Sequence, residues 1–115
     1  MTNKSIAKAF SNGEFENVFD FIADNAVWEV VEENTFHGKK AIIENCKQVA
    51  AYFLTVTTHF ELFNVIAEDN KVAVNGTAEF IREGNRVSFV KASDLYEFND
   101  QQQIQKITSY CIQAK

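Results

Sequence analysis

The second half of the sequence alternates between strand-like runs and short polar turns, and this pattern limits the fold more than any other feature. Turn sequences occur at Glu68–Lys71, Glu83–Arg86 and Asn99–Gln102. Around them lie four runs rich in β-branched and aromatic residues: THFELFNVIAED, KVAVNGTAEFIRE, RVSFVKASDLYEF and QIQKITSYCIQ. Parallel neighbours need a crossover of about a dozen residues or more, and these connections are shorter. The four runs therefore predict an antiparallel meander.

The first part of the chain shows helical spacing on one side of a short strand. Ile6 and Phe10 share a face of a first helix, which Thr2 or Ser5 caps and which ends at SNGE. The stretch EFENVFDFIADN predicts a short second helix, and AVWEVV, residues 26–31, predicts the first strand. We expect EENTFHG to be a polar turn.

A longer helical stripe follows this turn. Ile42, Cys46, Val49 and Phe53 step by four, three and four residues, which predicts one face of a helix of about four turns. The order helix, helix, strand, helix and four strands is typical of an α+β fold with its helices on one side of an antiparallel sheet. We expect a single domain over residues 1–115. Because the strands carry apolar residues on both faces, we expect a homodimer to cover the second face.

Charge and hydropathy exclude several classes of partner. The net charge is −5 and no basic cluster exceeds Lys39–Lys40, so we expect no nucleic-acid partner. No apolar run approaches the ~20 residues that cross a bilayer, and MTNKSIAKAF lacks the apolar segment of a secretory signal, so we expect no membrane partner. Cys46 and Cys111 lie in apolar patterns, which predicts two buried thiols in a reduced, cytoplasmic protein. The alternative is a disulfide between them, which depends on a distance that the sequence does not give.

The residues that most often hold metals and cofactors are not arranged for that purpose. His37, His59, Cys46 and Cys111 show no metal-ligand spacing, so we expect no metal site. The sequence also has no glycine-rich phosphate loop, so we expect no nucleotide cofactor. His37 lies in the polar turn, where an exposed or capping side chain is expected.

Three segments together carry a resemblance to a known family. NGEFENVFDFIADNAVWEV, FHGKKAI at the start of the long helix and DLYEFNDQQQIQKITSY resemble, in this order, the SnoaL-like branch of the nuclear transport factor 2-like superfamily. The resemblance covers nearly the whole chain. It implies a cone-shaped, curved antiparallel sheet wrapped by helices around a pocket, and a dimer through the outer face of the sheet. The superfamily includes steroid isomerases, polyketide cyclases, dehydratases, an epoxide hydrolase and non-catalytic binding domains, so the fold alone does not give the function.

Asp94 is the first candidate site residue. In the strand FVKASDLYEF it is the only charge on the more apolar face, which also carries Val90 and Tyr96. The resemblance to the steroid isomerases places their oxyanion-hole aspartic acid on Asp94. It places their catalytic base on Val30 and their tyrosine on Ile6, and neither replacement can transfer a proton.

Two further residues could complete a catalytic set. Glu79 could face the same cavity as Asp94 from a neighbouring strand, and such a pair would split its pKa values into an acid and a base. His59 begins a strand and could act as a general base at the pocket mouth. The alternative for Glu79 is solvent or a dimer partner, and the alternative for His59 is an ordinary strand start.

The resemblance also implies a mostly apolar pocket. The residues expected to line it are Trp28, Val49, Phe53, Val90, Ala92, Tyr96, Ile107, Ser109 and Cys111. The first functional hypothesis is a domain that binds a small apolar or carbonyl-bearing molecule. The second is an isomerase, cyclase or dehydratase that uses Asp94 with Glu79 or His59. The third is a non-catalytic, dimeric interaction domain.

The charge state of Asp94 separates two roles. If the side chain faces a cavity, desolvation raises its pKa and it can donate a hydrogen bond to a ligand oxygen. If it is hydrogen-bonded as an anion, its pKa falls and its role is structural.

Overall fold

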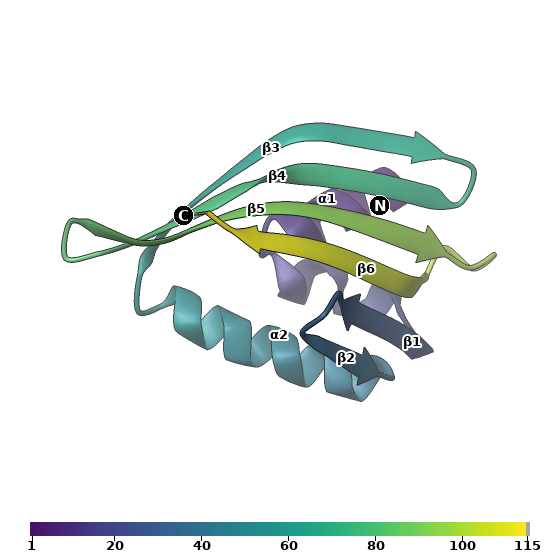
Figure 1. Ribbon diagram of the computed structural model, residues 1–115. Coiled ribbons are helices and arrows are strands. Elements are labelled where there is room, and N and C mark those ends of the chain that lie inside the picture. Colours follow the sequence, from purple (N-terminus) through teal and green to yellow (C-terminus); the bar gives the residue numbers. More distant parts are fainter. Residues whose placement is uncertain (115) are drawn as a thin grey trace.

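The computed structural model describes residues 1–114 and is dominated by strands (Figure 1). In chain order the elements are α1 (Asn3–Ser11), the 3-10 helix η1 (Phe15–Phe21), β1 (Ile22–Val30), β2 (Asn34–His37), α2 (Lys39–Phe53), β3 (Thr57–Glu68), β4 (Lys71–Arg82), β5 (Asn85–Phe98) and β6 (Ile104–Gln113).

All the strands join one six-stranded sheet in the order β2-β1-β6-β5-β4-β3. The last four strands form the expected antiparallel meander. The sheet is mixed, however, because β1 runs parallel to β6, with Val30 opposite Ser109. The expectation of a wholly antiparallel sheet is wrong at this one pairing. The α2 helix and the meander together form a connection long enough for a parallel neighbour, which short turns do not allow.

Two boundaries in the first part of the chain also differ from the expectation. The stretch EENTFHG is not only a turn, because Asn34–His37 forms β2 and pairs with β1, Trp28 lying opposite Phe36. The second helix is a 3-10 helix that ends at Phe21, and β1 begins at Ile22 rather than at Ala26. Pairing with a long partner strand extends β1 beyond its own strand-forming residues.

The two α-helices begin where the sequence indicates. Thr2 caps α1 by accepting a hydrogen bond from the Ser5 backbone N–H, and the Ser5 side chain accepts one from the Thr2 N–H. The α2 helix begins after Gly38, whose φ of +91° favours glycine. On α2, Ile42 and Cys46 are fully buried against the core.

The helices cover one face of the sheet. In Figure 1, α2 lies along the end of the sheet that β1 and β2 form, and α1 lies behind the meander. The core between these layers includes Ile6, Phe10, Val18 and Tyr96. The opposite face is open, and it carries the exposed side chains of Tyr110 and others.

A close backbone approach bends the meander. A Cβ on Gly76 would lie 2.1 Å from the backbone oxygen of Glu61 on β3, so only glycine fits at this position. The β3–β4 register shifts just beyond, between Leu62 and Asn64. Such bulges increase the twist and curvature of a sheet. This bend lets the concave face wrap around the helices and leave a hollow.

Candidate functional site

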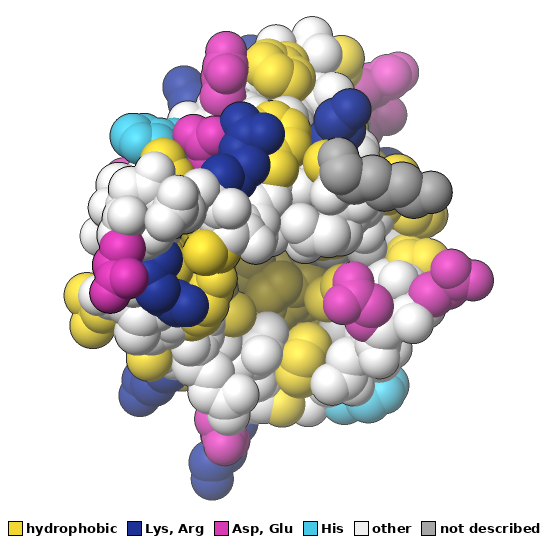
Figure 2. Space-filling view, turned by 60° about the vertical axis from the view of Figure 1, so that its left-hand side comes forward, with side chains coloured by type: hydrophobic (Ala, Val, Ile, Leu, Met, Phe, Trp, Pro, Cys, Tyr) yellow, Lys and Arg dark blue, Asp and Glu magenta, His cyan; other side chains and the backbone are white. Residues whose placement is uncertain are grey.

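A cavity of about 220 Å³ lies between the helices and the concave face of the sheet. Its wall is mostly aromatic and aliphatic; the rings come from Phe10, Phe15, Trp28, Phe53, Phe60 and Phe80. Figure 2 shows a hollow with a hydrophobic floor on this side of the molecule. Four of these rings form one packed group, since Phe53 contacts Phe15, Phe60 and Phe80 at centroid distances of 5.5 to 6.3 Å. The wall is therefore held by ring packing and suits an apolar molecule.

Asp94 supplies the carboxyl group of this cavity, and strand alternation places it there. It lies on β5 opposite Val74 of β4, and both side chains line the cavity. The Ser11 hydroxyl, at the end of α1, donates a hydrogen bond of 2.8 Å to Asp94 Oδ2. The same hydroxyl lies 2.6 Å from the Tyr96 hydroxyl. The last residue of α1 therefore joins two side chains of β5.

A second hydrogen-bonded pair approaches the same carboxyl from the other side. Trp28 on β1 donates its indole N–H to Ser109 Oγ on β6 at 3.0 Å. Ser109 is Asp94's register partner on the neighbouring strand, and its hydroxyl lowers the pKa of the Asp94 carboxyl. Both serines thus lie between a buried aromatic side chain and Asp94.

The surroundings of Asp94 change its acidity in opposite directions. Desolvation by burial raises the pKa of the carboxyl, and the hydrogen bonds from Ser109 and Ser11 lower it; the net direction is upward. Burial also raises the pKa of Tyr96 well above its usual value, and Asp94 adds to that rise. For Cys111, burial and then Asp94 raise the pKa to about 11. Tyr96 and Cys111 are therefore neutral near pH 7, and the Asp94 carboxyl is held more readily in its neutral form than a free aspartic acid.

The structure brings most of the sequence-predicted lining residues around the cavity. Seven of them line it: Trp28, Val49, Phe53, Val90, Ala92, Ser109 and Cys111. Tyr96 and Ile107 do not reach its surface, because both are fully buried in the core beneath it. The Tyr96 hydroxyl is nevertheless hydrogen-bonded to Ser11, which does line the cavity.

Glu79 and His59 lie on the other face of the sheet. Along β4, the side chains of Val74, Ala78 and Phe80 line the cavity, so Glu79 points the opposite way, and its register partner on β3 is His59. The expectation that either residue shares a cavity with Asp94 is wrong. The relative faces of neighbouring strands depend on register, which the turn sequences did not fix.

The two arginines of the meander also have partners away from the cavity carboxyl. Arg86 forms an ion pair with Glu79, and its Nε–H donates at 2.7 Å to the same carboxylate. Its guanidinium lies 4.5 Å from the centre of the Phe89 ring. Arg82 donates to the Thr55 hydroxyl at 3.1 Å. Within the described residues, no basic side chain lines the cavity with Asp94.

Sequence reasoning missed several residues of this site. Ser11 is the most important, because it contacts the carboxyl and yet lies at a helix end, 83 positions from Asp94. Phe60 and Phe80 lie on the cavity side of their strands, where every second side chain faces the cavity. This two-residue alternation could have identified both as lining residues. Nothing in the local sequence indicates the role of Ser11.

The cysteines and histidines do not form a second site. Both cysteines are free; Cys46 is buried as expected, and burial raises its pKa to about 12. The expectation of a buried thiol is wrong for Cys111, which is exposed and lines the cavity near the end of β6. Across residues 1–114, no three His, Cys, Asp or Glu side chains gather as a metal site would require. No helix in that same range is long and apolar enough to cross a membrane.

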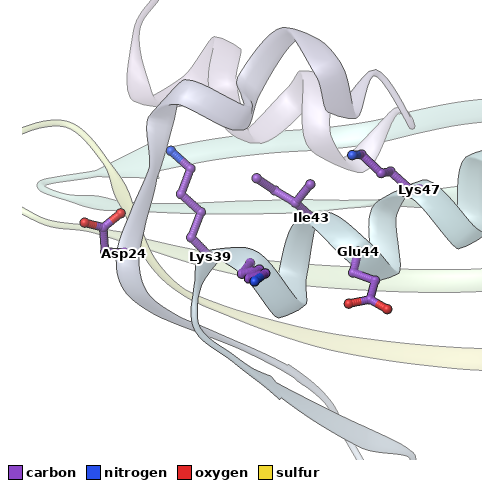
Figure 3. Close-up of a pocket in the computed structure, with 6 residues that line it drawn as sticks. Asp24, Lys39, Ile43, Glu44 and Lys47 are labelled. Carbon is purple, nitrogen blue, oxygen red and sulfur yellow. The ribbon is translucent and has the colours of Figure 1, made fainter.

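A larger and more open hollow of about 550 Å³ lies beside the start of α2 (Figure 3). It is lined by Asp24, Lys39, Lys40, Ile43, Glu44 and Lys47. Figure 3 shows Lys39, Ile43 and Lys47 on one side of the helix and Glu44 on another. Charges of both signs surround it and the side chains lie in solvent, so it has the character of an ordinary polar surface.

Solved structures share this architecture. The chain is similar to an NTF2-like protein of unknown function from Cytophaga hutchinsonii, with 30% identity, a TM-score of 0.81 and 94% of each chain covered. It is similar in fold to an epoxide hydrolase-like protein from M. tuberculosis, with 18% identity, a TM-score of 0.69 and coverage of 96% of this chain and 84% of that one. A putative polyketide cyclase from Sinorhizobium meliloti gives 18% identity, a TM-score of 0.62 and coverage of 89% and 86%.

Family membership follows from the sequence itself. Among curated protein sequences, none matches this chain. The family model of the SnoaL-like domain matches residues 4–107, which span the chain from the first turn of α1 to the first part of β6. The protein therefore belongs to the SnoaL-like domain family of NTF2-like folds.

Proposed function

We propose that this protein binds a small, largely apolar, carbonyl-bearing molecule in the cavity, with the neutral Asp94 carboxyl donating a hydrogen bond to the carbonyl oxygen. One observation carries the proposal: a single carboxyl group, with a pKa raised by desolvation, lines an otherwise aromatic cavity. A carboxylic acid that stays neutral in an apolar site becomes a hydrogen-bond donor.

The volume sets the size of the ligand. Small-molecule sites usually measure about 300–1,000 Å³, and this cavity of about 220 Å³ is smaller. A cavity of about 150 Å³ can hold benzene. The site therefore suits a molecule with one ring and a few substituents, and it is too small for a fused multi-ring system.

An enzymatic function has weaker support. The resemblance to epoxide hydrolase-like and polyketide cyclase proteins is one of fold alone at these identities. An isomerase, cyclase or dehydratase that uses Asp94 with Glu79 or His59 is not supported, because both partners lie on the opposite face of the sheet. Asp94 alone could still serve as a general acid, and its raised pKa favours that role.

The homodimer predicted from the sequence is proposed as well. The outer face of the sheet carries Tyr110 and Ile112, which are 52% and 66% exposed, and apolar area of this kind is usually covered. Dimerisation through this face would leave the cavity free, since the cavity opens on the concave side. A non-catalytic interaction domain would use the same surface. A cytoplasmic location stays a prediction from the sequence.

Two ligands of equal shape test the binding proposal. Acetophenone and α-methylstyrene differ only in a carbonyl oxygen against a methylene group. Their affinities are measured by NMR titration of methyl-labelled protein, following the cavity residues Val49 and Val90. We expect acetophenone to bind about three- to tenfold more tightly at low pH, the gain from one hydrogen bond.

Two variants separate the hydrogen bond from the shape of the cavity. Asp94→Asn keeps a donor that does not titrate, so it should prefer the ketone at every pH. Asp94→Leu has no donor, so it should bind both molecules alike. In the wild-type protein the preference should disappear as the pH rises through the Asp94 pKa, because the carboxylate cannot donate. Equal affinities in the wild-type protein at low pH, or no shifts at the cavity methyls, would refute the proposal.

A further inference from the structure

The direction of the hydrogen bonds around Asp94 follows from the burial of Tyr96. Tyr96 is fully buried, and its hydroxyl has one hydrogen-bond partner, Ser11 Oγ at 2.6 Å. If the tyrosine accepted this bond, its own O–H would have no acceptor within the described residues. A buried donor without a partner is costly, so the tyrosine donates.

This assignment fixes the role of Ser11. A serine hydroxyl has one proton to donate and can accept in addition. Because Ser11 Oγ accepts from Tyr96, its own proton points to Asp94 Oδ2, 2.8 Å away. The reverse arrangement, with Asp94 Oδ2–H donating to Ser11, would leave either the serine or the tyrosine proton without a side-chain acceptor among residues 1–114. The chain of bonds therefore runs one way, from Tyr96 to Ser11 to Asp94.

We infer that Tyr96 and Ser11 form a one-way hydrogen-bond relay that keeps Asp94 Oδ2 an acceptor, so that an Asp94 proton lies on Oδ1 and is donated to the ligand. This inference rests on the proposed binding function and makes Tyr96 and Ser11 positioning residues that determine specificity. On the β6 side, Trp28 donates to Ser109 Oγ, and Ser109 lies directly opposite Asp94 in the register of β5 and β6. Around Asp94 the described residues supply donors, and the ligand must supply the acceptor.

The charges that face Asp94 agree with this reading. From β5 the neighbouring titratable group is Tyr96, and from β6 it is Cys111; both have raised pKa values and are neutral near pH 7. Glu33 acts on Cys111 from the β1–β2 turn. From α1 and β1 the groups are Ser11 and Trp28, which do not titrate. The residues that line the cavity include no cation that would stabilise the ionised Asp94 carboxylate. Desolvation, and a ligand that accepts a hydrogen bond, therefore both favour the protonated form.

The test compares Tyr96→Phe with the wild-type protein, using acetophenone and α-methylstyrene at low pH. Phenylalanine keeps the ring in the core and removes the donor to Ser11. Ser11 no longer accepts from Tyr96, so its own proton can turn to a carbonyl of the preceding helical turn. Its oxygen can then accept from Asp94 Oδ2–H, and the carboxyl proton is satisfied inside the protein. We expect the ketone preference to fall about three- to tenfold, towards equal binding, while α-methylstyrene binds as before.

A second pair of variants keeps the test decisive if Tyr96→Phe folds poorly. Ser11→Ala removes a donor that lowers the Asp94 pKa, so carbon-detected NMR titration should give a higher value than in the wild-type protein. Ser11→Thr restores a hydroxyl and should restore the wild-type value. A merely structural serine would not produce this pattern of loss and rescue.

The outcomes separate the two proposals. If the wild-type protein shows no ketone preference, the proposed function fails first. If the wild-type protein prefers the ketone and Tyr96→Phe prefers it equally, the relay is refuted and the binding function stands. An Asp94 pKa in Ser11→Ala that equals the wild-type value also refutes the relay. A preference for the isosteric cation 1-phenylethylamine at low pH would show an anionic Asp94 and would overturn both.

Discussion

Removing the Ser11 hydroxyl should destabilise the fold more than removing the hydroxyl of Tyr96, although Ser11 is the smaller and less buried residue. In Ser11→Ala the Tyr96 hydroxyl loses its one hydrogen-bond partner inside the core. A buried donor left without an acceptor costs about 1–3 kcal/mol. Alanine recovers about 0.5 kcal/mol in helix propensity at the end of α1. The loss of the bond to Asp94 adds about 1 kcal/mol, which gives about 1.5–3.5 kcal/mol in all.

The tyrosine variant gives a different result because it leaves no buried hydroxyl group without a hydrogen-bond partner. Tyr96→Phe removes the buried hydroxyl together with its bond, and Ser11 keeps Asp94, so we expect a loss of about 0.5–1.5 kcal/mol. In the double variant Ser11→Ala/Tyr96→Phe the tyrosine hydroxyl is absent. The cost of leaving that hydroxyl buried without a partner therefore disappears. The double variant should therefore lose about 1–3 kcal/mol less than the sum of the two single variants.

Urea unfolding at pH 7 measures these differences, with the fluorescence of Trp28, the single tryptophan, as the signal. Ser11→Thr is the matched control, because it keeps the hydroxyl. Additive losses in the double variant, or a Ser11→Ala loss no greater than that of Tyr96→Phe, would show that the Tyr96 hydroxyl has another acceptor. That result would also remove the basis for the direction of the relay.

Three further outcomes follow from the structure. The fold holds the Asp94 pKa above that of the unfolded chain, so its stabilising contribution is complete only below the unfolded pKa and is lost as the pH rises through the folded one. Asp94→Asn should therefore be at least as stable as the wild-type protein at pH 7 in urea unfolding, and its advantage should shrink as the pH falls. Gly76→Ala should lower the free energy of unfolding by about 3 kcal/mol or more, because the new Cβ would lie 2.1 Å from a backbone oxygen. Gly84→Ala is the matched control: its φ is +79° but open space surrounds it, so it should lower the free energy of unfolding by about 1 kcal/mol. A pKa raised from 9.0 to about 11 leaves the exposed Cys111 about a hundredfold less thiolate than a free thiol, so iodoacetamide at pH 8 should alkylate it slowly. The buried Cys46 should react only on unfolding. Rapid alkylation of Cys111 seen by mass spectrometry would contradict its raised pKa, and rapid alkylation of Cys46 would contradict its burial.

Local sequence patterns predicted the elements that depend on local physics. The cap at Thr2, the helical stripe from Ile42 and the three turns of the meander all rest on spacing and turn chemistry, and the structure confirms them. The β2 strand is short and polar, and it exists because β1 pairs with it. Its residues alone therefore gave no strand signal.

The candidate site shows the same limit. Asp94 could be placed on an apolar face because alternation along one strand is readable from sequence. Glu79 could not, since its face relative to Asp94 depends on the register between two strands. Ser11 reaches the carboxyl only through the packing of α1 on the sheet, which no periodicity encodes.

The position of β6 between β1 and β5 has a consequence for the order in which this protein folds. The β1–β2 hairpin is made early, yet its neighbour in the sheet is the strand made last of the six. Local contacts within the meander can form first, because closing short loops costs little entropy. The hairpin must wait for the final strand, and until then its edge is unpaired. During synthesis on the ribosome, the aromatic wall around Trp28 would therefore close only after β6 has emerged, which makes this hairpin the segment of the sheet most exposed to chaperones and to wrong strand pairing.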